Sequence, residues 1–226
     1  TIGNDAIQVD RHKVRLPKIC WIKMREEVRF PGKIQTIAIS RKADRWFISF
    51  TVKVDDHTHH FKQHAENQGE VVGLDAGLSS LAVISTGEKF DPPHSLKKNL
   101  KKLRRLNKAL ARKKRGSKSR AGAKQRLARL HRKIENMRLD YLHKLTSILT
   151  ERFKFICVET LNIKGLIRGR QSRSWADAAV GELKRQLVYK AKLRGGEVIS
   201  ADRFFPSTQL CHCCGWRNRN LTLNDR

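Results

Sequence analysis

The chain has 226 residues, and its 49 Lys and Arg against 21 Asp and Glu give a formal net charge of +28. This excess excludes an ordinary neutral enzyme surface, while 39% hydrophobic residues suffice for a core and exclude a purely disordered basic protein. No apolar run reaches the roughly 18 to 20 residues of a membrane span, and no signal pattern opens the chain, which predicts a soluble intracellular protein. The expected partner is a polyanion: nucleic acid first, with a membrane surface as the weaker alternative.

Short alternating apolar runs, broken by turn formers, cover residues 7–54. They predict a small antiparallel β-barrel of five or six strands in residues 1–55, whose scattered Lys and Arg form either a solvated face or nucleic-acid contacts. Residues 56–69 lack periodicity and predict a linker. Four histidines occur in this linker, and they indicate metal only weakly because no Cys or carboxylate stands at ligand spacing: His57, His59, His60 and His64.

A β-hairpin is predicted next, because two apolar runs, 71–74 and 80–85, are closely joined and a turn follows at 86–88. From Leu96 to Ile148, apolar residues then recur at steps of three and four, which predicts two amphipathic helices. The polar stretch between them, residues 112–122, is expected to be the exposed tip of a helical hairpin that spans about 95–151.

This predicted hairpin concentrates positive charge, since twenty Lys and Arg but only two acids lie between Lys97 and Lys144. A solvated helical face normally mixes the two signs in i to i+4 pairs, so the one-sided pattern favours binding to a phosphate backbone. No aromatic residue interleaves with the cations up to Arg132, which favours a duplex over stacked single-stranded bases. The candidate nucleic-acid-binding residues are Lys97, Lys101, Arg104, Arg105, Lys108, Arg112, Lys113, Lys114, Arg115, Arg126, Arg129 and Arg132.

The remaining pattern indicates four further segments. An apolar run over 153–161 predicts a buried strand, and the Gly, Arg and Ser segment over 164–174 predicts a mobile loop. Apolar residues at steps of four predict a helix over 176–193, which Gly195-Gly196 ends before a last strand over 197–200.

Two acids stand at the ends of predicted strands: Asp75 after the run 71–74, and Glu159 after the run 153–158. Either acid alone is more readily a turn former or a helix cap. Together, in a strongly basic chain, they favour a site for Mg²⁺ (or Mn²⁺), because hard cations are held by clustered carboxylates and relieve the repulsion between them. The order of hairpin, helices, strand, helix and strand agrees with a ribonuclease-H-like sheet.

Near the end of the chain, Cys211 and Cys214 form a CxxC pair followed by Gly215, as in a zinc-knuckle turn. A tetrahedral structural site needs four ligands, so this is half of a zinc ribbon. Cys213 and His212 are less favoured ligands. A thioredoxin-like dithiol is the weaker alternative, because the strand-to-helix context of such motifs is missing.

Taken in order, these motifs resemble the TnpB (OrfB) family of transposon-encoded proteins, which are relatives of the type V CRISPR effector nucleases. Three segments resemble the family's wedge β-barrel, two resemble its first and second RuvC motifs, and two lead into its zinc ribbon that binds target nucleic acid. The wedge-like segments are Leu16-Pro17-Lys18-Ile19, Gly32-Lys33-Ile34 and Trp46-Phe47-Ile48-Ser49-Phe50. The segments that resemble the two RuvC motifs are Gly73-Leu74-Asp75-Ala76-Gly77 and Val158-Glu159-Thr160-Leu161-Asn162-Ile163. The segments that lead into the zinc ribbon are Leu187-Val188-Tyr189-Lys190-Ala191-Lys192, and Phe205-Pro206-Ser207-Thr208 with Cys211 to Gly215.

The resemblance implies an α/β (α+β overall) protein with a wedge-like barrel over 1–55, a RuvC-like nuclease domain over 70–206 that carries the helical hairpin, and a truncated zinc ribbon over 207–226. It implies RNA-guided cleavage of double-stranded DNA, with a guide RNA derived from the transposon end. Asp75 and Glu159 would be the catalytic, metal-binding acids, and zinc would occupy the complete ribbon. A cytoplasmic, nucleoid-associated protein of a bacterium or archaeon, acting in DNA transposition and recombination, is expected.

The sequence also departs from the family. Its members begin with a helical region that is missing here, and they continue through a second CxxC to a third catalytic acid, whereas Asp225 resembles the residue before that second CxxC. The chain is therefore expected to be a fragment that lacks one catalytic acid, and whether it cleaves alone is left open. The alternatives are a catalytically inactive nucleic-acid-binding remnant or regulator and, less favoured, a basic structural protein such as a ribosomal component.

Overall fold

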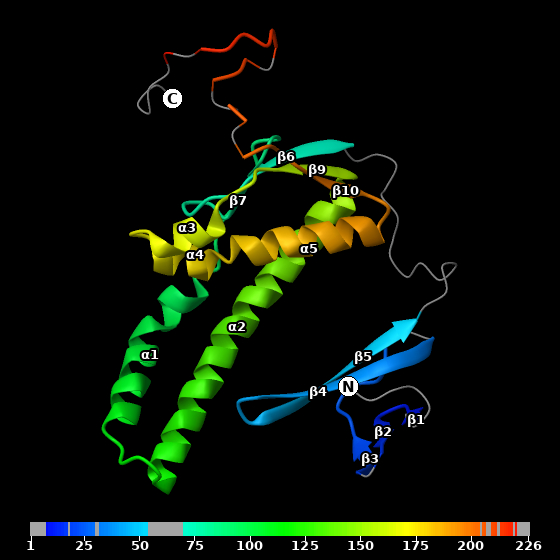
Figure 1. Ribbon diagram of the computed structural model, residues 1–226, viewed down its shortest axis with the longest axis vertical. Helices are drawn as coiled ribbons and strands as arrows, with labels where there is room; N and C mark the ends of the chain where they lie inside the picture. The colour runs from blue at the N-terminus through cyan, green and yellow to red at the C-terminus, as the bar shows by residue number, and fades with distance from the viewer. Residues whose placement is uncertain are drawn as a thin grey trace. The chain divides into compact units, whose positions relative to one another are not determined.

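The structure is a computed structural model that describes residues 8–17, 19–29, 32–53, 70–203, 205–206, 209–211, 213–218 and 220. The chain divides into two compact units, one formed by Thr1–Lys62 with Ser95–Leu139 and the other by Gln63–His94 with Asp140–Arg226. Figure 1 labels most of the helices and strands of both. No helix in the described part of the chain combines the length and the apolar character that crossing a membrane requires.

The first unit contains two antiparallel sheets. One has the order β1-β2-β3, with β1 at Gln8–Asp10, β2 at Lys13–Leu16 and β3 at Cys20–Lys23. The other is a long hairpin of β4, Lys33–Lys42, and β5, Arg45–Lys53. The strands that alternation predicts in this part of the chain are therefore present.

The predicted closed barrel is not formed by the described residues, because their five strands pair into two separate sheets. Val14 and Leu16 of β2 are buried together with Ile37 of β4, so the two sheets share a small core without sharing hydrogen bonds. Alternation fixes which face of a strand is buried, but it does not fix which strand pairs with which, and the expectation of closure was wrong for that reason. The predicted linker 56–69 and its four histidines lie outside the described residues.

The helical hairpin consists of α1, Ser95–Ala111, and α2, Lys118–Arg152. Its tip is shorter than predicted, since α2 begins at Lys118 and not after residue 122. The hydroxyl of Ser117 accepts a hydrogen bond from the backbone N–H of Arg120 at 3.1 Å, which caps the helix. The Arg120 guanidinium also donates to the carbonyls of Leu110 and Lys113, at 3.0 and 2.9 Å, and so ties α2 to the end of α1.

The second unit is built on a five-stranded mixed sheet with the order β10-β9-β6-β7-β8. Its strands are β6, Val71–Asp75; β7, Ala82–Ile84; β8, Lys89–Phe90; β9, Phe155–Val158; and β10, Glu197–Ser200. β6, β9 and β10 run parallel, whereas β7 and β8 continue from β6 in antiparallel fashion. The order of strands and helices follows the prediction, except that three helices, and not one, lie between β9 and β10.

Two helices cover one face of this sheet, namely the last turns of α2 and the whole of α5, Val180–Leu193 (Figure 1). Every second residue of the central strands points into this core, as a half-buried sheet requires. Most of the buried side chains come from β6, β9, α2 and α5, and they include Val72, Leu74, Ile156, Val158, Leu142, Leu145, Leu149, Leu183 and Leu187.

The segment 164–174 is not the loop that its composition predicts. Residues Ile163–Arg168 form α3 and residues Ser172–Ala178 form α4. The side chain of Asn162 accepts a hydrogen bond from the backbone N–H of Gly165 at 3.3 Å, so a single capping residue starts a helix in a Gly- and Arg-rich stretch. The predicted helix 176–193 is likewise divided, because Ala179 has a positive φ of 52° between α4 and α5.

Candidate metal site and nucleic-acid interface

Two carboxylates leave the sheet of the second unit at the same edge. β6 and β9 are parallel neighbours with Leu74 opposite Val158, so the next residue of each chain segment, Asp75 and Glu159, stands at the carboxyl end of its strand. Both residues are exposed, and their carboxyl groups interact directly. The structure therefore brings together the two acids that the sequence singles out.

The electrostatics of this pair disfavour two free negative charges. The pKa of Glu159 is raised above its ordinary value, first by desolvation and then by the neighbouring Asp75 carboxyl, while the backbone N–H of Ala76 partly opposes the rise. A divalent cation would relieve this cost. Among the described residues no group of three candidate ligands exists. Two carboxylates nevertheless fit Mg²⁺, which is commonly held by one or two carboxylates together with waters and substrate oxygens.

Local backbone contacts fix where the two acids stand. After Asp75, the N–H of Gly77 donates to the carbonyl of Leu81 at 3.3 Å, and a Cβ at Gly77 would lie 3.1 Å from the Ser80 carbonyl oxygen, so the turn closes tightly around a glycine. After Glu159, the hydroxyl of Thr160 donates to the carbonyl of Ala201 at 2.7 Å, which ties this segment to the end of β10. Both acids are thus held by the strand that precedes them and the turn that follows.

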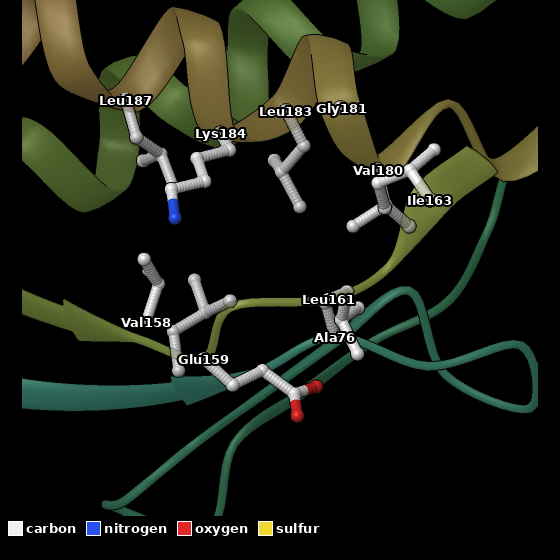
Figure 2. A pocket seen from close by; sticks show the side chains of 11 residues that line it. Ala76, Val158, Glu159, Leu161, Ile163, Val180, Gly181, Leu183, Lys184 and Leu187 are labelled. Carbon is white, nitrogen blue, oxygen red and sulfur yellow. The ribbon is translucent and has the colours of Figure 1, made fainter. Parts of the chain in front are cut away.

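A pocket lies beside Glu159, between α5 and the ends of β6 and β9 (Figure 2). It holds about 430 Å³ of empty space including its open mouth. Its lining is apolar except for Glu159 and Lys184, and Figure 2 shows the Lys184 amino group directed toward the end of β9. Sequence reasoning missed Lys184, because a steps-of-four pattern predicts a helix but does not tell which strand end its polar residues approach.

Arg129 and Arg132, which belong to the predicted nucleic-acid-binding set, form ion pairs with Asp44 within the first unit. Arg129 donates to one carboxylate oxygen of Asp44 at 2.9 Å, and Arg132 donates to the other at 3.0 Å. Desolvation works against ionisation of Asp44, but a backbone hydrogen bond and the two guanidinium groups outweigh it and lower the pKa of Asp44. Lys42 adds an ion pair with Glu135 at 2.8 Å. Arg129 and Arg132 thus attach the β4–β5 turn to α2.

The other ten predicted cations are exposed. On α1 they lie outside the stripe of half-buried residues that includes Leu96, Leu100 and Leu103. At the tip, residues 112–116 are all exposed. The exposed members are Lys97, Lys101, Arg104, Arg105, Lys108, Arg112, Lys113, Lys114, Arg115 and Arg126. These exposed, positively charged side chains are accessible to phosphate groups.

The cysteine segment forms a tight turn. The backbone N–H of Cys211 donates to the carbonyl of Trp216, and that of Gly215 donates to the carbonyl of Cys211, each at 2.9 Å, with Gly215 at a positive φ of 71°. Hydrogen bonds from the backbone N–H groups of Cys214 and Cys213 lower the pKa of the Cys211 thiol. A turn that stabilises a thiolate in this way suits a zinc ligand. His212 and Asp225 lie outside the described residues.

Comparison with protein families gives two matches. Residues 49–170 match OrfB_IS605, described as "Probable transposase", and residues 181–225 match the "Cas12f1-like, TNB domain". The first match covers more than half of the chain and includes both Asp75 and Glu159. The second includes Lys184 and the cysteine turn.

Curated relatives carry one shared name. The chain is 36% identical over 193 residues to a "Putative RNA-guided DNA endonuclease" of Streptomyces pristinaespiralis, which covers 84% of this chain and 46% of that protein. It is 32% identical over 228 residues to the "Putative RNA-guided DNA endonuclease InsQ" of Escherichia coli (strain K12), with 93% and 55% covered. The chain thus spans about half the length of the curated relatives it matches.

A solved structure shares the fold. The chain resembles a chain of the "Cryo-EM structure of the Cas12f1-sgRNA-target DNA complex" with a TM-score of 0.53 and 16% sequence identity, over 86% of this chain and 41% of that chain. At this identity the likeness bears on the mixed α/β fold alone.

Proposed function

The chain belongs to the OrfB_IS605 family of probable transposases, and from this premise we propose that it is part of a transposon-associated, RNA-guided DNA endonuclease. The observation that carries the proposal is the parallel pairing of β6 with β9, which places the Asp75 and Glu159 carboxyl groups side by side. The strand order β10-β9-β6-β7-β8 supports a ribonuclease-H-like (RuvC) domain over residues 70–206, because both acids then end central strands.

In the proposed mechanism, Asp75 and Glu159 would hold Mg²⁺ (or Mn²⁺), and the bound cation would supply Lewis-acid chemistry for phosphodiester hydrolysis. The residues of the chain supply the positioning. The parallel register sets the spacing of the two acids, and the Ala76 N–H, which hydrogen-bonds to Glu159, restrains that carboxylate. Both acids are exposed, so a DNA strand would have access to them.

The proposal extends to partners and place. The exposed cations of α1, the tip and Arg126 would bind the phosphate backbone of guide RNA and double-stranded DNA. RNA and DNA both appear in the names of the relatives and of the structural neighbour. Cys211 and Cys214 would supply two zinc ligands over residues 207–226. The protein would act in DNA transposition in the cytoplasm of a bacterium or archaeon, close to the nucleoid.

The site is also compatible with a second function. Among the described residues the site has two acids and no third ligand, which suits a non-catalytic nucleic-acid-binding remnant or regulator equally well. Nucleic-acid binding by the chain would fall steeply with salt under either function, so salt dependence does not separate the two functions.

Metal binding and cleavage do separate them. Titration with Mn²⁺, followed by electron paramagnetic resonance, is expected to show one site that Asp75→Asn and Glu159→Gln weaken by at least about tenfold. Glu197→Gln is the matched control, because Glu197 is exposed at the opposite end of the same sheet, level with Phe155. Equal Mn²⁺ affinity in all four proteins would exclude the proposed metal site.

Cleavage is then measured with the full-length protein that contains this chain, on DNA that matches its bound guide RNA. Asp75→Asn is expected to abolish cleavage while duplex affinity stays within about twofold, because one exposed carboxylate adds little to backbone binding. Cleavage retained by Asp75→Asn would remove Asp75 from the mechanism. Guide and DNA binding without cleavage by the unmodified full-length protein would favour the regulator.

A further inference from the structure

The pocket beside Glu159 contains one cation that the proposed mechanism does not use. Of its eleven lining residues, nine are apolar or glycine, and the other two are Glu159 and Lys184. Lys184 lies on the second turn of α5 and is half-buried. Figure 2 shows its side chain extending from α5 toward the end of β9, where Val158 and Glu159 lie.

The charge of Lys184 is available to a ligand. Within the described part of the chain no ion pair or hydrogen bond engages its ammonium group. The adjacent Arg185 differs, because both of its hydrogen bonds to the Glu182 carboxylate are 2.7 Å long. A lysine whose stem lies along an apolar lining keeps its ammonium group in the open mouth, where it attracts an anion.

The surroundings strengthen that attraction. Gly181 in the first turn of α5 also lines the pocket, and no side chain caps the start of this helix. The free N–H groups of a helix N-terminus carry partial positive charge, so they add to the potential that Lys184 creates. The negative charge of Glu182 in this turn is already paired with Arg185.

We propose that Lys184 is a positioning residue that binds a phosphate of the DNA strand next to the phosphodiester at the Asp75–Glu159 pair. The apolar lining between them then seats the intervening deoxyribose, whose carbon face carries no sequence information. This assignment rests on the proposed nuclease function. In it, the pocket sets which phosphodiester of the strand lies at the two acids. A strand held at Lys184 presents one fixed phosphodiester to the acids.

Three variants separate charge from packing. Lys184→Met keeps the apolar stem and removes the charge, whereas Lys184→Arg keeps the charge. Lys192→Met is the matched control, since Lys192 is exposed on the same helix and does not line the pocket. The probe is a fluorescein-labelled single-stranded DNA of nine nucleotides, with Ca²⁺ in place of Mg²⁺, and the readout is the dissociation constant by fluorescence anisotropy across a salt series.

Lys184→Met is expected to weaken binding roughly threefold to tenfold and to reduce the salt slope by about one, as the loss of one phosphate contact does. Lys184→Arg is expected to stay within about twofold of the unmodified chain, and Lys192→Met to leave the slope unchanged. A Lys184→Met protein that matches Lys192→Met in affinity and slope would overturn the proposal, and so would a Lys184→Arg protein as weak as Lys184→Met.

Repeating the DNA titration in a Glu159→Gln background separates the assignment of Lys184 from the proposed nuclease function. A Lys184→Met effect that persists there supports the phosphate contact independently of the metal. If the Mn²⁺ titration fails while the Lys184 effect persists, the nuclease function falls and Lys184 remains a phosphate-binding residue. If Mn²⁺ binds as expected and Lys184→Met has no effect, the assignment of Lys184 alone is overturned.

Discussion

Lys190 and Thr146 join the two helices that cover the sheet, because the Lys190 ammonium donates to the Thr146 hydroxyl at 2.8 Å. The same ammonium donates to the His143 carbonyl at 2.7 Å and to the Ser147 hydroxyl at 2.8 Å. Thr146 is fully buried and also bonds to the buried side chain of Gln186 at 3.1 Å. A polar network therefore fixes α5 on α2, and α5 in turn carries the pocket beside Glu159.

This network predicts a pH-dependent stability. Desolvation and the nearby Arg194 lower the pKa of Lys190 to about 8, from an ordinary value of 10.5. Between these two values the unfolded chain binds more protons at Lys190 than the folded chain, so the contribution of Lys190 to the free energy of unfolding rises with pH. Chemical unfolding of the unmodified chain and of Lys190→Met should show a difference that moves in favour of the unmodified chain from about pH 8 to 10.5. Lys192→Met serves as control, and a constant difference would contradict the prediction.

The acid pair predicts that Glu159 lowers the stability of the metal-free chain and allows Mg²⁺ to stabilise it. Because the folded pKa of Glu159 is raised, folding takes up protons there, and its contribution to stability falls as pH rises from the unfolded pKa through the folded one. Without metal at pH 7, Glu159→Gln should therefore raise the melting temperature. With Mg²⁺ at ten times its dissociation constant, the unmodified chain should gain about 1.4 kcal/mol and the variant nothing. An equal Mg²⁺ response in both proteins would contradict this.

Two arginines of the helical hairpin are expected to have different roles, one in duplex binding and the other in stability. Arg132 is largely buried against Asp44, whereas Arg126 is exposed. Arg126→Met should weaken duplex binding and lower the salt slope by about 0.9, the value for one phosphate contact. Arg132→Met should instead lower the melting temperature, because Asp44 loses one of its two ion-pair partners. Fluorescence anisotropy and thermal unfolding of both variants test this prediction. It would be refuted if Arg126→Met lowered the melting temperature and Arg132→Met weakened duplex binding instead.

The cysteine turn predicts site-selective chemistry. Backbone N–H groups that stabilise the Cys211 thiolate should make this cysteine react with iodoacetamide at a lower pH than an ordinary thiol does. Zn²⁺ should protect Cys211 and Cys214 and leave the reaction of Cys20, in the other unit, unchanged. Peptide mass spectrometry after timed alkylation measures each site. Equal protection of Cys20 would argue for nonspecific metal binding.

The candidate acids could be predicted from the sequence because each one's place at the end of a strand depends on local signals. Each acid ends an apolar strand, and parallel strands deliver their carboxyl ends to one edge of a sheet. The hairpin at β6 and β7, the last strand and the two long helices follow from periodicity in the same way.

Other features could not be predicted because they depend on single contacts or on distant residues. One capping side chain, Asn162, turns a loop-like composition into α3, and Ser117 with Arg120 shortens the hairpin tip. The charge pattern did not reveal that Asp44 engages Arg129 and Arg132, because this pairing joins residues far apart in the chain. Closure of the β-barrel likewise depends on pairing between strands, which alternation does not encode.

The tip of the hairpin has a consequence for engineering. The spacing of Asp75 and Glu159 is set by the β6–β9 register, while the chain between them leaves the sheet and turns back at an exposed tip where Gly116 has open space around it. Exposed tips accept foreign sequence, and the entropy of closing a longer loop grows only with the logarithm of its length. Residue 116 is therefore a point at which a reporter or a second binding domain can be spliced in while the register that spaces the two acids is left intact.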